Sequence, residues 1–463
     1  MSAATLFAAF VALATFALAV VLPSADPDTY WHLASAKWMV DHGQLLTRDP
    51  FSSTVSGMPY SVGEWAGELA WYAAYLAAGW QGIDVLRALV VAIAAFFSAK
   101  TILLVQPRPI FATAPLLAAL AIGKTTWTDR PQLFTLALFA VFLFVLLRVH
   151  AGARRAWLWV LPPLLLLWTN LHAGYAIGVG LIALFAIDAI VRRAPAWRPL
   201  VAVLVVGALA SMLNPEAFGP LGAAGHVANP PRFIAEELPP DVFTPQGFTF
   251  AVLLVASLAS GILAGGTAPL WPMLLVPLVW LALSAQRHLP LAAIPLAAFV
   301  AESAPRAIAR AWSLDPSRAR GEARLALPLA AAALAVAAIA TLAVAAAYAP
   351  RDPDTSAYPV VALAALRSSP REMLNEYDWG GYLIWNAPEH PVFIDGRTFV
   401  YVPVVLDEYR RLVELRPDFR AVLEARRIQT VLLKPDRPLV AYLRDAGWMV
   451  LSQDARAVLL RRP

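Results

Sequence analysis

The loop that follows the first apolar segment carries several acids. Asp26 and Asp28 flank a proline directly after that segment, and Asp49 and Glu64 follow further along the same loop. A charged group costs roughly 2.5–3.5 kcal/mol at the centre of a bilayer, so acids beside a membrane span need a reason. A carboxylate there suits a general base that takes the proton of an acceptor hydroxyl. Asp26 and Asp28 also suit a shared divalent cation, Mg²⁺ or Mn²⁺, which prefers hard oxygen ligands.

Arg130, Arg287 and His288 are cations that suit a phosphate group. One reaction that would use both a base and such cations is sugar transfer from a lipid phosphate, in which the leaving phosphate needs cations more than a proton donor. Arginine holds phosphate through two parallel hydrogen bonds. In the C-terminal segment, Asp395-Gly396-Arg397 directly follows an apolar run, where loops often carry binding groups. We predict these catalytic residues: Asp28, Asp26 and Glu64. We predict these substrate-binding residues: His32, Asp49, Arg130, His172, Arg287, His288, Asp378, Trp379, Asp395 and Arg397.

Many of these groups also have a purely structural interpretation. An aspartate at a helix start accepts backbone N–H groups, and this capping role suits Asp26 or Asp28 as well as catalysis does. The other structural interpretations are a turn at Asp49-Pro50, span anchoring by Arg287 and His288, a hydrogen-bonded pair of His172 and Asn170, a solvated loop at Glu236 and Glu237, and a local ion pair of Asp395 and Arg397.

Composition places the chain among polytopic membrane proteins. It has 463 residues, of which 60% are hydrophobic and only 14% charged. The net charge of +5 comes from arginines in short loops, so it indicates orientation in a membrane and not nucleic-acid binding. The absence of cysteine excludes disulfides, thiolate metal sites and a cysteine nucleophile. The first apolar run lacks a basic leader, so we expect a retained span.

About eleven apolar segments predict membrane-spanning helices. They cover residues 5–22, 83–105, 109–123, 131–149, 157–168, 172–191, 200–213, 248–263, 269–285, 289–301 and 325–349. Arginines gather in alternate loops, most densely after the tenth segment, at Arg306, Arg310, Arg318, Arg320 and Arg324. By the positive-inside rule the N-terminus is cytoplasmic, and the candidate acids and the C-terminal segment lie outside.

The first loop and the C-terminal segment both carry regular structure. Helical stripes at Trp31, Ala34 and Trp38 and at Trp65, Leu69, Tyr72, Leu76 and Trp80 predict two surface helices, or for the second stripe an extra span. Strands at 383–385, 392–394, 430–433 and 457–460 alternate with helices at 406–416, 419–426 and 439–446. We expect a transmembrane domain at 1–349, with loop 23–82, and an α/β domain at 350–463.

This pattern resembles the GT-C glycosyltransferases, polytopic enzymes that use polyprenyl-phosphate sugars. The resemblance rests on an acid soon after the first span, here Asp28, on two surface helices in that loop, and on a soluble domain after the last span. The runs 28–32, 49–52 and 395–397 look like a bacterial branch of that family. The run 376–380 is similar to the Trp-Trp-Asp-Tyr-Gly motif of oligosaccharyltransferase catalytic subunits, with Glu376, Tyr377 and Trp379 as departures.

The resemblance implies an inverting glycosyltransferase of the bacterial inner membrane, active on its periplasmic face. Asp28 takes the role of the base, with Asp26 second. The implied partners are a polyprenyl-phosphate sugar donor in the membrane and an acceptor glycan, lipid or protein. Beyond the divalent cation no cofactor is expected. Two other classes stay open: a lipid or glycan transporter, which predicts ionisable residues deep in the spans, and a non-catalytic scaffold for envelope assembly.

Overall fold

A computed structural model describes residues 2–24, 26–216, 235–312 and 327–463. The predicted loop residues Arg318, Arg320 and Arg324 lie outside these ranges. The chain divides into two compact units, each described here by itself. The first unit comprises Met1–Leu22 and Gln81–Pro350, and the second comprises Pro23–Trp80 and Arg351–Pro463.

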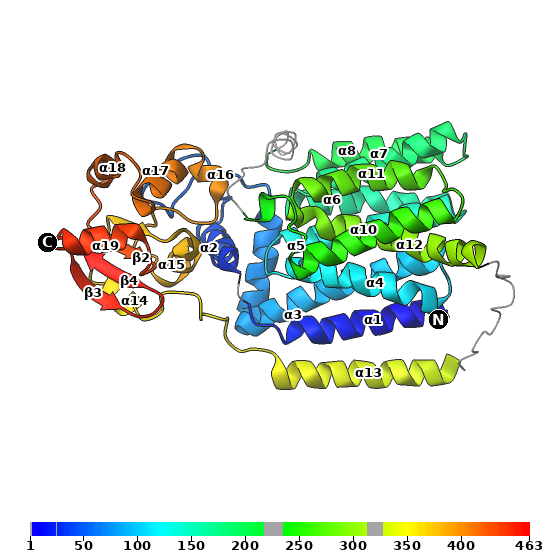
Figure 1. The fold of residues 1–463 in the computed structure, drawn as a ribbon, viewed down its shortest axis with the longest axis horizontal. Helices are drawn as coiled ribbons and strands as arrows, with labels where there is room; N and C mark the ends of the chain where they lie inside the picture. Colours follow the sequence, from blue (N-terminus) through cyan, green and yellow to red (C-terminus); the bar gives the residue numbers. More distant parts are fainter. Residues whose placement is uncertain (1, 25, 217–234, 313–326) are drawn as a thin grey trace. The chain divides into compact units, whose positions relative to one another are not determined.

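The first unit is a bundle of apolar helices, joined in places by 3-10 turns (Figure 1). Each predicted apolar segment contains a helix in the described part of the chain. The helices are α1 (Ala3–Val20), the second part of α3 (Trp65–Val105), α4 (Pro109–Gly123), α5 (Gln132–His150), α6 (Leu161–Leu171), α7 (Tyr175–Val191), α8 (Trp197–Ser211), α10 (Pro245–Leu263), α11 (Leu270–Ser284), α12 (Leu289–Ala311) and α13 (Leu327–Tyr348). The 3-10 turns are η1 (Lys124–Thr126), η2 (Arg155–Val160), η3 (Ala235–Glu237) and η4 (Gln286–His288).

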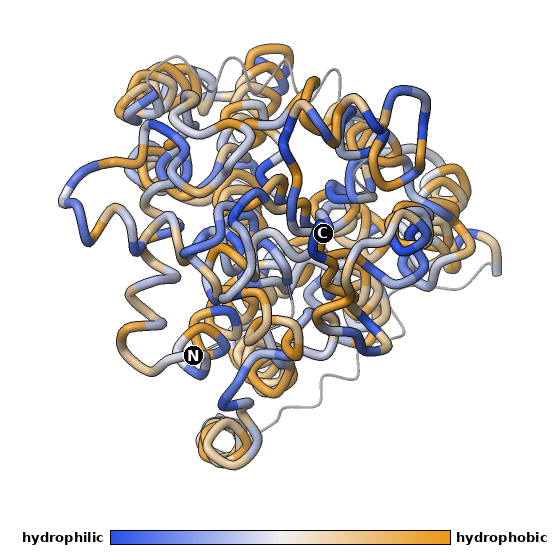
Figure 2. The backbone as a smooth tube through the Cα atoms, turned by 90° about the vertical axis from the view of Figure 1, so that its left-hand side faces the viewer, coloured by the Kyte–Doolittle hydropathy of each residue, from blue (hydrophilic) through white to orange (hydrophobic). Residues whose placement is uncertain are grey.

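Hydrophobic residues, which are orange in Figure 2, predominate in the helices of this unit. Among the described residues, six helices are long and apolar enough to cross a membrane. A helix that is hydrophobic all round must be buried in protein or in lipid. Within the unit α12 packs against α4, α10 and α11, while α8 packs against α6 and α7. The chain is therefore a polytopic membrane protein.

The second unit contains a small mixed sheet covered by helices. Its strands are β1 (Met373–Asn375), β2 (Thr430–Leu433), β3 (Met449–Gln453) and β4 (Val458–Arg461), in the order β1-β2-β4-β3. β1 and β2 are parallel, and the other two pairings are antiparallel. The helices are α2 (Pro27–His42), the first part of α3, α14 (Leu363–Leu366), η6 (Tyr377–Trp379), α15 (Gly380–Asn386), α16 (Thr398–Tyr401), α17 (Val404–Val413), α18 (Phe419–Ala425) and α19 (Pro438–Asp445).

Sequence predictions for this unit are confirmed in part. The strands at 430–433 and 457–460 correspond to β2 and β4, and the three predicted helices correspond to α17, α18 and α19. The strand predicted at 383–385 is wrong, because these residues form α15; a short apolar run does not distinguish a strand from a buried helix. The strand predicted at 392–394 is also wrong, since only Val392 pairs, in one isolated bridge with Ser52.

The first loop forms part of the core of the second unit. α2 packs against α15, and Trp31 and Ala34 of the first aromatic stripe are buried with Tyr358, Trp379 and Tyr382. These two residues, which the pattern predicted for a membrane surface, therefore contact protein. The second stripe forms the first part of α3, which is broken at Ala78 and Gly79 by non-helical backbone angles.

Candidate functional site

Asp28 lies in the first turn of α2, at a helix start that the local sequence dictates. Pro27 has the fixed φ that a first helical position requires. Asp26 is the N-cap residue, and its Oδ1 accepts the Asp28 backbone N–H at 2.9 Å, so the capping interpretation of Asp26 is confirmed. The partial positive charge at the start of the helix stabilises the Asp28 carboxylate by about 0.3–1 kcal/mol. Asp28 is partly exposed and open to a reactant.

Three groups surround the Asp28 carboxylate. Trp31 donates its Nε1–H to Oδ1 over 2.9 Å. Gly396 lies so close that a methyl group in place of its hydrogen would overlap Oδ1 and approach Cγ to 3.0 Å. Burial raises the pKa of the Tyr377 phenol, and the negative charges of Asp28 and Asp395 raise it further. Tyr377 thus stays protonated beside the Asp28 carboxylate.

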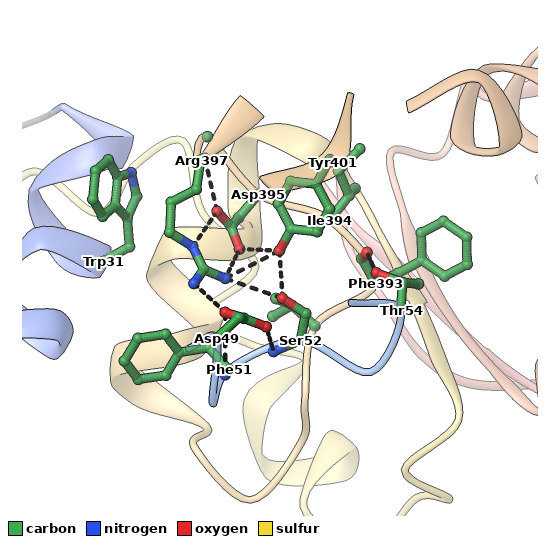
Figure 3. Close-up of polar contacts among 12 residues, drawn as sticks. Trp31, Asp49, Phe51, Ser52, Thr54, Phe393, Ile394, Asp395, Arg397 and Tyr401 are labelled. Carbon is green, nitrogen blue, oxygen red and sulfur yellow. Dashed lines mark hydrogen bonds and ion pairs between the residues drawn. The ribbon is translucent and has the colours of Figure 1, made fainter. Parts of the chain in front are cut away.

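A buried ion cluster ties the first loop to the C-terminal segment of the same unit (Figure 3). The Arg397 guanidinium is 0% exposed and lies between the carboxylates of Asp49 and Asp395. Its Nε donates to Asp395 Oδ1 at 2.8 Å, and its Nη2 donates to the Tyr401 hydroxyl at 3.0 Å and to Ser52 Oγ at 3.2 Å. The predicted local pair of Asp395 and Arg397 is confirmed, and Asp49, 348 residues away in sequence, joins it.

Arg397 keeps its charge in this cluster, and Tyr401 keeps its proton. Burial alone would lower the pKa of Arg397, but the negative charges of Asp395 and Asp49 outweigh it and hold that pKa well above its usual range. Burial and the Asp395 carboxylate likewise hold the pKa of the Tyr401 phenol well above its usual range. Asp49 also accepts the Ser52 backbone N–H at 3.0 Å, so it both shapes the predicted turn and binds Arg397. These side chains are buried, and their hydrogen bonds join the first loop to residues 395–401.

His32 and Glu64 differ in how they are placed. His32 is 4% exposed, and its Nδ1 lies 3.1 Å from Oε1 of the buried Glu68, a residue that the sequence analysis did not select. Glu64 lies in the turn directly before α3 and is partly exposed. The helical spacing of Glu64 and Glu68 was visible in the sequence, but the partner of Glu68 lies 36 residues away on α2.

Trp379 lines a surface hollow of about 300 Å³, and Asp378 directly precedes Trp379 in the sequence. Asp378 pairs with Lys434 at 2.9 Å. Trp379 is 2% exposed and donates its Nε1–H to the Ala357 carbonyl at 3.0 Å. The hollow is lined by Ala357, Trp379, Lys434, Pro435, Asp436, Ala455 and Arg456. It combines an aromatic floor with two cations and one acid beside it.

The two predicted phosphate-binding arginines of the first unit each contact a glutamate of η3. Arg130 Nη2 lies 2.9 Å from Glu236 Oε2, and Arg287 forms an ion pair with Glu237. The solvated-loop interpretation is wrong for Glu237, whose side chain is only 6% exposed. Both arginines keep partial exposure, 17% for Arg130 and 27% for Arg287, so a ligand can reach them.

Asp129, the residue directly before Arg130, is held by a buried ion pair with Arg87. Arg87 is 2% exposed and donates to Asp129 Oδ1 and to Asp84 Oδ1, each at 2.8 Å. Because Asp129 directly precedes Arg130 in sequence, this pair anchors the segment that carries Arg130. The two acidic partners of Arg87 were not predicted from the sequence.

His172 and His288, the two histidines of this unit that the sequence predicts as binding residues, each make a hydrogen bond within the unit. His172 Nδ1 lies 2.8 Å from Thr135 Oγ1 and accepts the Gly174 backbone N–H at 3.0 Å. His288 Nδ1 lies 3.3 Å from the Leu281 carbonyl oxygen. Neither contact requires a substrate.

Asp26 and Asp28 by themselves would give a divalent cation fewer than three side-chain ligands. The described residues contain no cluster of three or more histidine, aspartate or glutamate side chains that would hold a metal ion. Mg²⁺ requires near-octahedral oxygen coordination, and Asp26 uses one oxygen to cap α2. No chemical step is therefore assigned to a metal here.

Comparison with known proteins identifies the fold. No protein-family model and no curated protein matches the chain. Among solved structures it is similar to ArnT from Cupriavidus metallidurans bound to undecaprenyl phosphate, with a TM-score of 0.52, 16% identity, and coverage of 99% of this chain and 98% of ArnT. The apo form of ArnT matches with a TM-score of 0.52 and 15% identity, over 97% of this chain and 96% of ArnT. An Archaeoglobus fulgidus oligosaccharyltransferase tethered with an acceptor peptide matches with a TM-score of 0.43 and 13% identity, over 92% of this chain and 69% of the oligosaccharyltransferase. The chain has the fold of ArnT, a GT-C glycosyltransferase.

Proposed function

We propose that this protein is an inverting glycosyltransferase that moves a sugar from a polyprenyl-phosphate donor to an acceptor. The observation that carries the proposal is the Asp28 carboxylate, which is partly exposed, lies at the positive end of α2 and has Oδ1 hydrogen-bonded to Trp31. The chain shares the fold of ArnT, whose structure holds undecaprenyl phosphate. Sugar transfer from such a lipid needs one general base, and Asp28 meets that need.

Asp28 acts on the acceptor in this scheme. As the acceptor oxygen attacks the anomeric carbon, its proton passes to the Asp28 carboxylate. The bond between the anomeric carbon and the phosphate oxygen breaks, and the electron pair leaves with the polyprenyl phosphate. Attack opposite the leaving group inverts the anomeric centre. Proton transfer to a positioned base contributes about 10²–10⁴-fold to the rate of such a step.

Arg130 and Arg287 bind the lipid phosphate in this scheme. Both are partly exposed cations, and a phosphate monoester or diester suits the planar guanidinium group. Each arginine contacts a glutamate of η3 in the absence of ligand, so the phosphate takes the place of Glu236 and Glu237 as the anionic partner. Binding of the donor thus releases two carboxylates from two arginines.

The acceptor site is assigned to the hollow beside Trp379. Its lining combines the Trp379 indole with the charged side chains of Lys434, Asp436 and Arg456, which suit hydrogen bonds to a polar acceptor. The proposal includes about eleven spans with the N-terminus in the cytoplasm of a bacterium and residues 350–463 in the periplasm, as the distribution of arginines predicts.

Native mass spectrometry in mild detergent, with added undecaprenyl phosphate, tests the donor site. We expect the wild type to retain the lipid, and Arg130→Ala and Arg287→Ala to lose it. Arg192→Ala is the matched control, because Arg192 is an arginine of the same unit that pairs with Asp188 and is not assigned to the donor. Equal retention of the lipid by the wild type and both variants would contradict the donor site.

A further inference from the structure

Near the start of α2, three positions require glycine because a Cβ there would overlap neighbouring atoms, and not because of their backbone angles. Gly380, Gly381 and Gly396 all lack a positive φ, so other residues suit their backbone. A methyl group on Gly381 would lie 3.3 Å from the Trp31 ring, and one on Gly380 would overlap the Asp395 backbone. Glycine at such positions permits the close approach of another chain segment. The segment here is the first turn of α2.

The ion cluster determines where Gly396 lies. Gly396 sits between Asp395 and Arg397, and the Arg397 backbone N–H donates to Asp395 Oδ1 at 2.8 Å. The Arg397 side chain then links this turn to Asp49 and Ser52 of the first loop. A buried ion cluster is weak evidence for stability, because the desolvation of its charges offsets most of their attraction. Such a cluster can instead hold one geometry of the turn at Asp395, Gly396 and Arg397.

We propose that Gly396 is a positioning residue for Asp28, and that the cluster of Asp49, Asp395 and Arg397 holds it against the Asp28 carboxylate. Trp31 donates its Nε1–H to Oδ1, and Gly396 leaves that oxygen space that a Cβ would occupy, so both residues determine where the oxygen lies. The inference rests on the proposed role of Asp28 as the base. It adds that the C-terminal segment, far away in sequence, sets the orientation in which that base meets the acceptor.

Gly396→Ala tests this directly. The added methyl group overlaps the end of a partly exposed aspartate side chain, which can turn away, so folding should survive. A displacement of about 1 Å at a reacting group costs about 10²-fold in rate. We expect kcat for release of undecaprenyl phosphate to fall about 100-fold, with KM for the lipid donor and the melting temperature unchanged. Gly180→Ala is the control, because a methyl group there meets open space and no positive φ.

Trp31→Phe is the second variant, since it removes the hydrogen bond to Oδ1 and keeps a ring. We expect kcat to fall at unchanged KM here too, and this result decides the case if Gly396→Ala also lowers the melting temperature. Full kcat in either variant, at a normal melting temperature, overturns the positioning role. Release by the wild type and none by Asp28→Asn, together with full kcat in Gly396→Ala, would remove this inference alone. Release by Asp28→Asn would remove the proposed base.

Discussion

Replacing Glu236 and Glu237 with glutamine should strengthen binding of the lipid phosphate. In the structure each glutamate neutralises one of the two arginines assigned to the donor, at 2.9 Å for Arg130 and Glu236. A phosphate that enters this site must first break both ion pairs. The double variant removes that requirement and leaves both guanidinium groups in place.

The size of the effect follows from the exposure of the pairs. Arg130 is 17% exposed and Glu236 32%, while Arg287 is 27% and Glu237 6% exposed. Partly solvated pairs of this kind are worth about 0.2–1 kcal/mol each. Two such pairs correspond to about 0.4–2 kcal/mol, which is about 2–30-fold in the dissociation constant. Glu237 is the more buried of the two, so Glu237→Gln alone should give the larger share.

Titration of the purified protein with undecaprenyl phosphate by native mass spectrometry measures this change. Glu302→Gln is the matched control, since Glu302 pairs with Arg306 at 3.1 Å in the same unit and is not assigned to the donor. Tighter binding in the double variant but not in the control supports the reasoning. Unchanged or weaker binding in the double variant refutes it, because the glutamates would then not compete with the phosphate.

Variants at Arg397 and at Asp26, with a control at Arg367, address the second unit. Arg397→Met leaves Asp49 and Asp395 buried without a cation, and removal of one partner of a buried ion pair costs about 3–5 kcal/mol; thermal unfolding should show a large loss, whereas Arg367→Met, at a 64% exposed arginine, should show none. Asp26→Ser keeps an N-cap side chain and should retain full turnover, while Asp26→Ala should lower stability by about 0.5–2 kcal/mol. Loss of turnover in Asp26→Ser at unchanged stability would indicate a metal ligand instead.

Local chemistry made part of this structure predictable. Long apolar runs indicated the helices of the first unit, because an apolar stretch of that length is typical of a membrane-spanning helix. The start of α2 followed from Asp26 and Pro27, whose preferences act within one turn. The pair of Asp395 and Arg397 was within reach for the same reason, since these residues lie two positions apart.

Contacts between distant segments were not predictable from one sequence. Nothing near Asp49 indicates that Arg397 is its partner 348 residues later, and nothing near Arg130 indicates Glu236. The association of the first loop with residues 351–463 is of the same kind. The incorrect strand at 383–385 has a different cause: its apolar run is as compatible with a short buried helix as with a strand.

The most direct test of the account measures release of undecaprenyl phosphate by wild type and Asp28→Asn. The purified proteins are incubated with an envelope extract of the producing cells, which supplies donor and acceptor, and the free lipid phosphate is quantified by mass spectrometry over time. We expect steady release with the wild type and at least 100-fold less with Asp28→Asn, at equal melting temperatures. Equal release by both proteins, or none by the wild type above a protein-free control, would contradict the proposed transferase.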